Sequence, residues 1–321
     1  MKLITIIIPC FNEENSIAEL YTRLNQEISI INNYSFEILF INDGSSDDTL
    51  LKIKKLRNND QRISFVNLSR NYGKEIAMAA GFDYAIGDAA IIMDADLQHP
   101  PEIIKEMIYY WEEGYEDIYA KRLKREGESM FKRYTSKAYY RVLQKMTKIP
   151  ILEDVGDFRL LDRRCIEALK QFRESQRNTK GIYSWIGFRK KEIFFDAPIR
   201  KTGKSKWSLV SLIDLAIDGV TSFTILPLRI SSILGFFISV LAFIYLLFIV
   251  TKTIIFGEIV SGYPSLMVVI LFLGGIQLIS LGVIGEYLGR VFNETKNRPL
   301  YFVEDYKSKK VENRIYEEIP S

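Results

Sequence analysis

The first 200 residues alternate between two hydrophobic patterns. Short runs of β-branched and apolar residues predict strands that are buried on both faces, and apolar residues spaced three or four apart predict helices. The strand-like runs are 3–9, 36–43, 63–69 and 89–96, and the helix-like segments between them are 15–28, 47–60 and 74–87. This alternation predicts an α/β fold with a mostly parallel sheet covered by helices.

Polar or turn-forming clusters follow four of the predicted strands. They read PCFNEE (9–14), NDGSSDD (42–48), SRNYGK (69–74) and DADLQHP (94–100). In open α/β sheets, ligands bind outside the carboxyl ends of the strands. We therefore expect the functional site at this edge of the sheet.

The last third of the chain contains two long stretches without charge. No charged residue lies between Arg229 and Lys252 or between Glu258 and Glu286. A helix that crosses the hydrocarbon needs about 20 apolar residues, so we predict two transmembrane helices, at about 230–251 and 264–286. Basic residues gather after the second stretch, and the positive-inside bias therefore predicts that both termini lie in the cytoplasm. We expect a multi-pass protein of the inner, or cytoplasmic, membrane.

These patterns divide the chain into four parts. They are a cytoplasmic α/β domain (1–207), an interfacial amphipathic helix (208–228), the two transmembrane helices (229–290) and a cytoplasmic C-terminal tail (291–321). The segment before the first span is apolar apart from Asp214 and Asp218, which share one helix face. This pattern fits a helix in the membrane interface, and it equally fits an amphipathic helix packed on the α/β domain.

The composition narrows the classes of partner. Of the 321 residues, 48% are hydrophobic and 26% charged, with a net charge of +3, so the charge balance does not favour nucleic acid. Residues 120–148 interleave basic and aromatic residues without the signature of an RNA-binding module, and we predict contact with anionic lipid instead. Cys10 and Cys165 have no disulfide or metal spacing and are predicted to be reduced thiols.

Asp94 and Asp96 end the strand predicted over 89–96. Alternate residues of an extended chain point to the same side, and two adjacent carboxylates repel each other unless a cation lies between them. Oxygen ligands select Mg²⁺ or Mn²⁺, and Gln98 can add a carbonyl oxygen. The alternative is that Asp94 and Asp96 are two solvated acids in a loop.

His99 is the only histidine in the chain, so a histidine-based metal site is not expected. We predict that His99 lies around the loop that contains Asp94 and Asp96, outside the set of metal ligands.

The spaced set of motifs resembles the inverting family-2 glycosyltransferases. Within that family it is similar to the polyprenyl-phosphate sugar transferases related to dolichyl-phosphate mannose synthase and bactoprenol glucosyltransferase. The motifs are PCFNEE (9–14), NDGSSDDT (42–49), SRNYGKE (69–75), DADLQHP (94–100), DVGDFRLLDRR (154–164) and KTGKSKW (201–207). One departure is Asn42, where the family usually has Asp.

The resemblance implies a GT-A nucleotide-sugar-binding fold and a set of site residues. The nucleotide would contact Pro9, Phe11, Glu13, Asp43 and Asp94; the metal would bind Asp94, Asp96 and Gln98; and catalysis would involve Asp157 and Asp96. Diphosphate or acceptor phosphate would contact Lys74, Arg122, Arg133, Arg159, Arg200 and Lys206. Alternatives stay open for Glu13, which can cap the following helix, and for Lys74, which can be a solvated helix start.

The resemblance also implies the reaction. The expected enzyme transfers one sugar from a nucleotide diphosphate sugar, with UDP-glucose or UDP-N-acetylglucosamine as the leading donors, to polyprenyl phosphate with inversion at the cytoplasmic membrane face. A processive polysaccharide synthase is the alternative enzyme, although the chain lacks the Gln-x-x-Arg-Trp motif of that class. A catalytically silent glycan-binding or scaffold protein is the alternative outside enzymes. Membrane lipid and a second copy of the chain are the other expected partners, since glycines in the second span permit helix packing.

Overall fold

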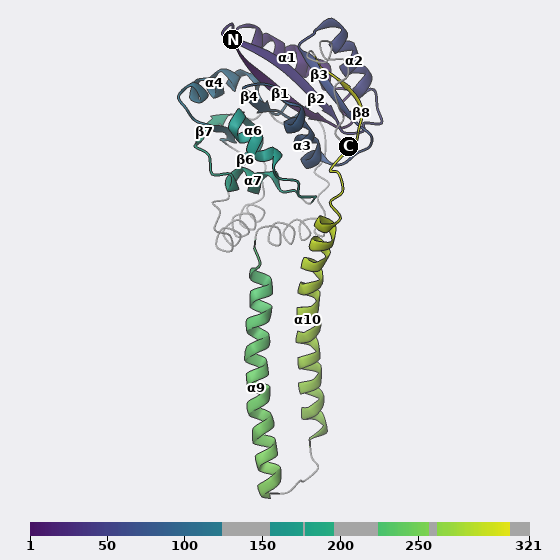
Figure 1. Cartoon of the computed structure of the whole chain (residues 1–321), viewed down its shortest axis with the longest axis vertical. Coiled ribbons are helices and arrows are strands. Elements are labelled where there is room, and N and C mark those ends of the chain that lie inside the picture. Colours follow the sequence, from purple (N-terminus) through teal and green to yellow (C-terminus); the bar gives the residue numbers. More distant parts are fainter. Residues whose placement is uncertain (124–154, 176, 196–223, 257–261, 309–321) are drawn as a thin grey trace. The chain divides into compact units, whose positions relative to one another are not determined.

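The computed structural model describes residues 1–123, 155–175, 177–195, 224–256 and 262–308 (Figure 1). The chain divides into two compact units. The sheet unit comprises Met1–Gln144, Lys148–Trp207 and Pro299–Ser321, and the hairpin unit comprises Lys145–Thr147 and Ser208–Arg298.

The sheet unit is built on a sheet that has eight strands in the part of the chain described. They are β1 (Lys2–Cys10), β2 (Tyr34–Asn42), β3 (Ile63–Leu68), β4 (Ala89–Ile92), β5 (Asp117–Arg122), β6 (Val155–Asp162), β7 (Lys190–Phe195) and β8 (Val303–Lys307), in the order β7-β5-β6-β4-β1-β2-β3-β8. The four central strands, β4-β1-β2-β3, are parallel, and β7 is parallel to β5. The pairs β4–β6, β5–β6 and β3–β8 are antiparallel. The predicted α/β fold with a mostly parallel sheet is confirmed.

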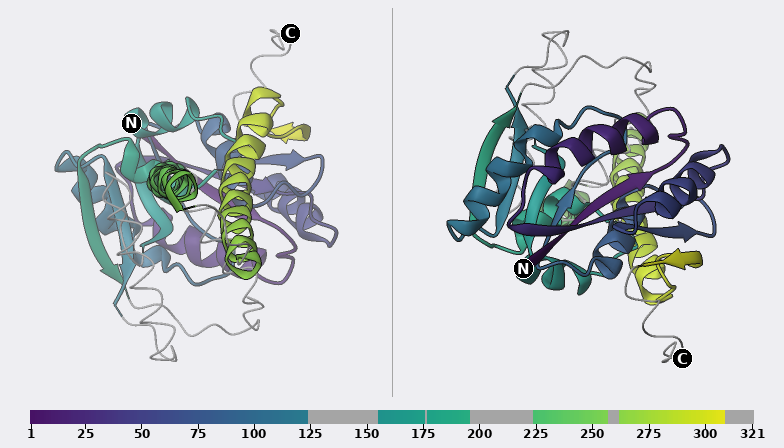
Figure 2. Two further views of the ribbon diagram at one scale, coloured as in Figure 1. Left: turned by 90° about the horizontal axis from the view of Figure 1, so that it is seen from below. Right: turned by 90° about the horizontal axis from the view of Figure 1, so that it is seen from above.

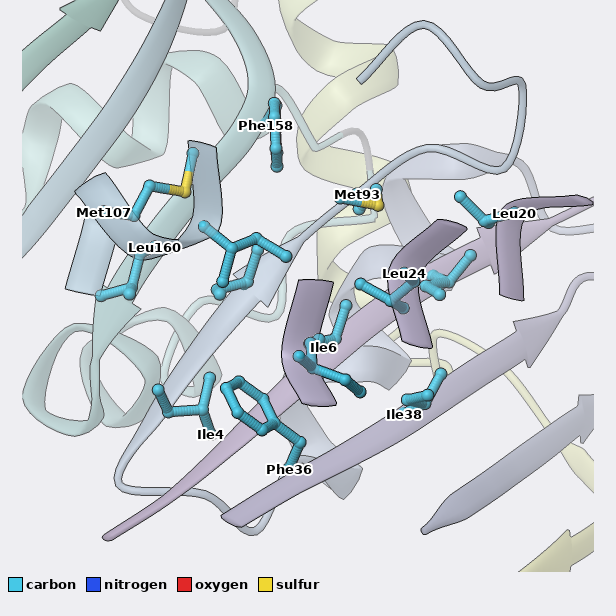
Figure 3. Close-up of a cluster of buried hydrophobic side chains, with 14 of the residues drawn as sticks. Ile4, Ile6, Leu20, Leu24, Phe36, Ile38, Met93, Met107, Phe158 and Leu160 are labelled. Atoms are coloured by element: carbon cyan, nitrogen blue, oxygen red, sulfur yellow. The ribbon is translucent and has the colours of Figure 1, made fainter. Parts of the chain in front are cut away.

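Helices cover both faces of this sheet (Figures 1 and 2). One face carries α1 (Ile17–Ser29), α2 (Thr49–Asn59), the short 3₁₀ helix η1 (Pro101–Ile103) and α4 (Ile104–Glu112); the other carries α3 (Lys74–Tyr84), α6 (Arg163–Lys170) and α7 (Thr179–Trp185). Every residue of β1 from Ile4 to Ile8 is buried, as expected for a strand covered on both sides. Figure 3 shows part of the first of the two cores, in which Ile4 of β1 lies beside Phe36 of β2, and Ile6 and Leu24 of α1 belong to the same cluster.

The strand order reverses at β1, which lies between β2 and β4. This reversal is the point where open α/β sheets bind ligands, at the carboxyl ends of the strands. The antiparallel strand β6 adds a further element there, because its Arg159 pairs with Ile92 near the end of β4. Asp157, close to the start of β6, is therefore brought to the same edge as the loop after β4.

The segment after residue 298 returns to the sheet unit. Within the predicted cytoplasmic tail (291–321), β8 extends the sheet beside β3. Just before β8, the Phe302 carbonyl accepts a hydrogen bond from Ser69 N–H at 3.0 Å, and the Tyr301 hydroxyl donates to Asp83 at 2.7 Å. Residues 301–307 are thus part of the α/β fold.

The hairpin unit contains two long helices, α9 (Leu226–Phe256) and α10 (Tyr263–Thr295). Leu226–Phe256 and Phe272–Thr295 are long and apolar enough to cross a membrane, by length and composition alone. The Tyr287 hydroxyl of α10 donates to the Thr224 carbonyl at 2.6 Å, which ties α10 to the residues that precede α9. Both helices extend past the predicted spans, and the predicted interfacial helix falls almost wholly outside the described residues.

Gly44 lies in the turn after β2 and cannot carry a side chain there. Its φ is +62°, and a Cβ would lie 2.3 Å from the Arg70 carbonyl carbon. We expect Gly44→Ala to lower the free energy of unfolding by about 2–5 kcal/mol, because backbone strain and overpacking act together. The measurement is thermal or denaturant unfolding of the purified full chain. Gly114→Ala is the matched control, since φ is +87° there but the nearest neighbour lies at 3.8 Å, so the loss should stay near 1–2 kcal/mol.

Candidate functional site

Lys74 joins two of the predicted site acids. Its ammonium Nζ lies 2.7 Å from Asp94 Oδ1 and 2.7 Å from Asp157 Oδ2. Burial alone would lower the pKa of Lys74, but Asp94 and Asp157 together raise it above its ordinary value. The ammonium is therefore a fixed positive charge between the loop after β4 and the start of β6.

The backbone before Lys74 is held by Asp43. Asp43 lies just past β2 and is buried, and its two carboxylate oxygens accept hydrogen bonds from Tyr72 N–H at 2.8 Å and Gly73 N–H at 2.9 Å. Gly73 has φ of +92° and directly precedes α3, so the chain turns sharply before the helix begins at Lys74. Burial raises the pKa of Asp43, while the two N–H donors lower it. Both oxygens of Asp43 thus already accept hydrogen bonds from the loop, and contact of Asp43 with the nucleotide stays a prediction.

Asp157 is only 7% exposed, and its Oδ1 has no hydrogen-bond partner in the described part of the chain. Burial would raise its pKa, but Lys74 and, more weakly, Lys180 and Arg159 lower it below the ordinary value. Asp157 is therefore ionised at neutral pH and offers one unused carboxylate oxygen. A buried acceptor oxygen without a partner is costly and marks a place where a ligand or ordered water can donate.

The loop after β4 is a turn, whereas we expected extended backbone through Asp96. β4 ends at Ile92, Leu97 has φ of +63°, and the Gln98 N–H donates to Asp96 Oδ1 at 3.1 Å. Ala95 packs into the core, where it is 3% exposed, and Asp94 and Asp96 on either side of it are both half-buried. Because this backbone is a turn, the alternation rule for strands does not apply to it, and a common side for the two carboxylates stays a prediction.

His99 supports this loop from within. Its Nδ1 accepts a hydrogen bond from Asp94 N–H at 2.9 Å, and its ring stacks on Phe158 with centroids 4.7 Å apart. Burial lowers the pKa of His99, although Asp94 and Asp96 raise it. The neutral ring, with its proton on Nε2, therefore holds the backbone of Asp94 in place.

The acids at this edge influence one another. Burial raises the pKa of Glu13, and Asp96 and Asp94 raise it further, against a hydrogen bond from the Ser16 hydroxyl that lowers it. The Glu13 carbonyl also accepts from Ser16 N–H and Ile17 N–H, in the turn that leads into α1. The N-cap of α1 is Ser16, and no side chain donates or accepts a capping hydrogen bond there. Glu13 therefore does not cap the helix through its side chain, and its carboxyl is within electrostatic reach of Asp94 and Asp96.

Of the three predicted metal ligands, the two aspartates are suited to a hard divalent cation and Gln98 has another partner. Asp94 and Asp96 offer carboxylate oxygens, the kind of ligand that Mg²⁺ and Mn²⁺ prefer, and their mutual repulsion with Glu13 would fall when a cation bound. Gln98 Oε1, in contrast, accepts a hydrogen bond from Arg122 at 2.7 Å. Within the described ranges, no group of three or more His, Cys, Asp or Glu side chains is arranged to hold a metal. The described residues thus supply two carboxylates of the kind such a cation binds, and Lys74 lies 2.7 Å and 2.8 Å from the two oxygens of Asp94.

Arg159 lies away from this open edge. It is 1% exposed, its guanidinium is 3.1 Å from Asp117, and it stacks on the Tyr183 ring at 3.6 Å. Lys190 reaches the same Asp117 at 2.9 Å. This geometry is that of a buried structural ion pair, and we do not include Arg159 among the proposed phosphate contacts.

Of the remaining predicted site residues, some lie in the described part of the chain and some lie outside it. Phe11 follows β1 and is exposed, Pro9 is half-buried near the end of β1, and Arg122 ends β5 beside Gln98. The predicted contacts Arg133, Arg200 and Lys206 lie outside the described residues. The sequence did not predict that Lys74 pairs with both Asp94 and Asp157. It also did not predict that Asp43 binds the backbone just before Lys74. The Gly73–Lys74 pair after a strand was the available signal, since glycine before a helix permits a sharp turn.

Comparisons with known proteins show which family the chain belongs to. The family profile described as "Glycosyl transferase family 2" matches residues 5–170, and that described as "GtrB C-terminal hairpin" matches residues 226–291. The chain is 48% identical to an uncharacterized glycosyltransferase of Synechocystis sp. over 302 residues, which cover 94% of this chain and 95% of that relative. It is 41% identical to the bactoprenol glucosyl transferase of Shigella phage SfV, covering 95% of this chain and 99% of that one. It is 42% identical to a prophage bactoprenol glucosyl transferase homolog of Escherichia coli, with the same two coverages.

The comparisons confirm the resemblance noted from the motifs. The family match spans more than half of the chain, and the full-length relatives share both the α/β part and the C-terminal helices. The chain therefore belongs to glycosyl transferase family 2, in its GT-A polyprenyl-phosphate glycosyltransferase branch.

Proposed function

We propose that this enzyme transfers a single sugar from a nucleotide diphosphate sugar to polyprenyl phosphate, such as undecaprenyl phosphate, at the cytoplasmic face of the membrane. UDP-glucose and UDP-N-acetylglucosamine are the donors we put first. Two observations support the proposal together: relatives named bactoprenol glucosyl transferases match almost the whole chain, and two helices are long and apolar enough to span a membrane.

The observation that carries the proposal is the position of Lys74 between Asp94 and Asp157. A diphosphate leaving group and a phosphate nucleophile are both anionic, so a transferase for them needs fixed positive charge next to the carboxylates that orient them. Lys74 supplies such a charge at the strand edge where ligands bind in this fold class. In a protein that only bound glycans these ion pairs would be purely structural, and the transfer assay below distinguishes the two functions.

Asp94 and Asp96 are the residues proposed to hold Mg²⁺ or Mn²⁺, which when bound supplies positive charge to the departing diphosphate. Gln98 has its carbonyl oxygen on Arg122, so we place it next to the metal ligands, where it positions Arg122 toward the same edge. Arg122 can then contact a phosphate through its planar guanidinium.

Asp157 is proposed to face the acceptor. Its free Oδ1 is buried beside Lys74, where a protonated phosphate could donate a hydrogen bond to it. Attack by the acceptor phosphate on the face opposite the diphosphate would invert the anomeric centre. Inversion is tested by determining the anomeric configuration of the lipid-linked product by NMR.

The test of the proposed function is a panel of labelled nucleotide sugars. Membranes that contain the full chain are incubated with each sugar and with polyprenyl phosphate, and the lipid-extractable product is measured. We expect a single-sugar lipid from one or two UDP-sugars and none from membranes that carry Asp96→Ala. A polymeric product would support the processive alternative, and no product from any donor would contradict the proposal.

A further inference from the structure

Three side chains connect the C-terminal strand to the end of β2. Asn42 Nδ2 donates to Asn67 Oδ1 at 2.6 Å, and Asn67 Nδ2 donates to Glu304 Oε2 at 2.8 Å. Asn42 and Asn67 are opposite each other on β2 and β3, and both are nearly fully buried. Glu304 lies on β8, where the pairing with β3 shifts register after Asn67.

The direction of these hydrogen bonds is fixed by Glu304. An ionised carboxylate only accepts, so the Asn67 amide must turn its NH₂ group toward Glu304 and its oxygen toward residue 42. Residue 42 must then donate, which Asn does and an ionised Asp cannot. The three residues therefore form a relay with one allowed orientation, which we call the amide relay.

The amide relay touches the loop before Lys74 at two points. Asn42 is followed directly by Asp43, whose carboxylate holds Tyr72 N–H and Gly73 N–H. On the neighbouring strand, Ser69 N–H lies two residues after Asn67 and donates to the Phe302 carbonyl at 3.0 Å. Residues 69–73 are thus held between the end of β2 and the C-terminal segment.

We propose that Asn42, Asn67 and Glu304 are positioning residues for Lys74. By docking β8, they fix residues 69–73 and with them the start of α3, so that the ammonium reaches both Asp94 and Asp157. β8 follows α10 after a short connector, so the segment that emerges from the hairpin unit is itself part of the support of the site. Only the transfer readout of this inference rests on the proposed function, since docking of β8 can be measured independently.

Asn42→Asp is the decisive single variant. The new carboxylate faces Asn67 Oδ1, and turning the Asn67 amide to donate to it would place that oxygen against Glu304. Hydrogen–deuterium exchange of the full chain in detergent or nanodiscs should show faster exchange at both 303–307 and 69–73. If the proposed function holds, kcat/KM for the donor should fall about tenfold, the size expected for an unpaired buried polar group.

Glu304→Gln should rescue this variant. In the double variant, the Asn67 amide can donate to one carboxylate oxygen at position 42 while its own oxygen accepts from the new amide at position 304, so both hydrogen bonds of the relay form again in the reverse direction. The second oxygen at position 42 takes the place of Asn42 Oδ1, which is buried and has no partner among the described residues. Glu304→Gln alone should stay within about threefold of wild type, since the carbonyl oxygen of the new amide can still accept from Asn67. Restored exchange protection in the double variant, with a restored KM, is the expected signature of the relay. A merely destabilised protein would instead lose active fraction, with KM unchanged.

Two further variants keep the test valid if Asn42→Asp does not fold. Glu304→Ala removes the exposed end of the relay without touching the core and should speed exchange at 69–73. Asp305→Ala, on the same strand, removes only the ion pair with Lys54 at 2.7 Å and should leave 69–73 protected. The proposal is overturned if Glu304→Gln fails to rescue Asn42→Asp, or if Glu304→Ala and Asp305→Ala change 69–73 equally. Altered exchange with unaltered kinetics would overturn the positioning role alone.

Discussion

Asp96→Ala is expected to reduce sugar transfer by about 10³-fold or more, and excess EDTA is expected to do the same to the wild-type enzyme. Asp96 points to the open side of the loop after β4, where its carboxylate can hold a divalent cation against the diphosphate. Losing one such source of charge stabilisation in the transition state costs about 10²–10³-fold, and losing the cation costs more. The measurement is the initial rate of lipid-linked product formation, with Mn²⁺ binding followed by electron paramagnetic resonance.

Glu102→Ala provides the control for this prediction. Glu102 is an acid close to the same loop, but it is exposed and pairs with Arg23 at 3.1 Å on the surface. Its removal should leave the rate within about twofold, because exposed ion pairs contribute little. Full activity in excess EDTA would contradict the metal, and an active Asp96→Ala enzyme would contradict its placement at the reaction centre.

Asp157→Asn is expected to slow transfer most at low pH. A phosphate monoester has a second pKa near 6, so at about pH 8 the acceptor is a dianion that needs no base. Near pH 6 part of the acceptor is protonated, and losing a positioned base then costs roughly 10²–10⁴-fold. The loss should therefore shrink as the pH rises from about 6 to 8, which is measured as kcat/KM for the acceptor across that range.

The pH dependence must come from the acceptor, because Asp157 does not titrate in this range. Its pKa is lowered below the ordinary value of 3.8, so its ion pair with Lys74 is complete at neutral pH and lost only as the pH falls through that lowered value. A loss that stays constant from about pH 6 to 8 would indicate that Asp157 acts only by orienting Lys74 or the acceptor. A loss that grows with pH would rule out its part in proton transfer.

The edge of the sheet that carries the site could be predicted from sequence. Buried parallel strands read as continuous apolar runs, and the polar clusters that follow them mark the carboxyl ends. The local backbone could not be predicted in the same way. Asp94 and Asp96 lie in a turn in which Ala95 packs into the core and Leu97 adopts a left-handed conformation, and side-chain alternation in a strand does not predict such a turn.

Contacts between distant segments account for what the sequence could not reveal. Arg159 follows Asp157 in a motif and was expected at a phosphate, but strand alternation does not show that Asp117 of the neighbouring strand β5 pairs with it in the core. β8 was missed because its five residues, Val303–Lys307, contain two acids and a lysine and show no apolar run. Its partner Asn67 is 237 residues away from Glu304 in sequence, so no local pattern links the two.

The return of the chain to β3 changes how a water-soluble version of the enzyme should be made. Cutting the chain before the first hydrophobic helix would delete β8 and turn β3, whose six residues are all buried, into an open sheet edge. Open, flat and apolar edges invite pairing between molecules and aggregation. A soluble catalytic fragment should instead keep residues 299–308 and replace the hairpin by a flexible linker, so that the last strand is supplied in the same polypeptide.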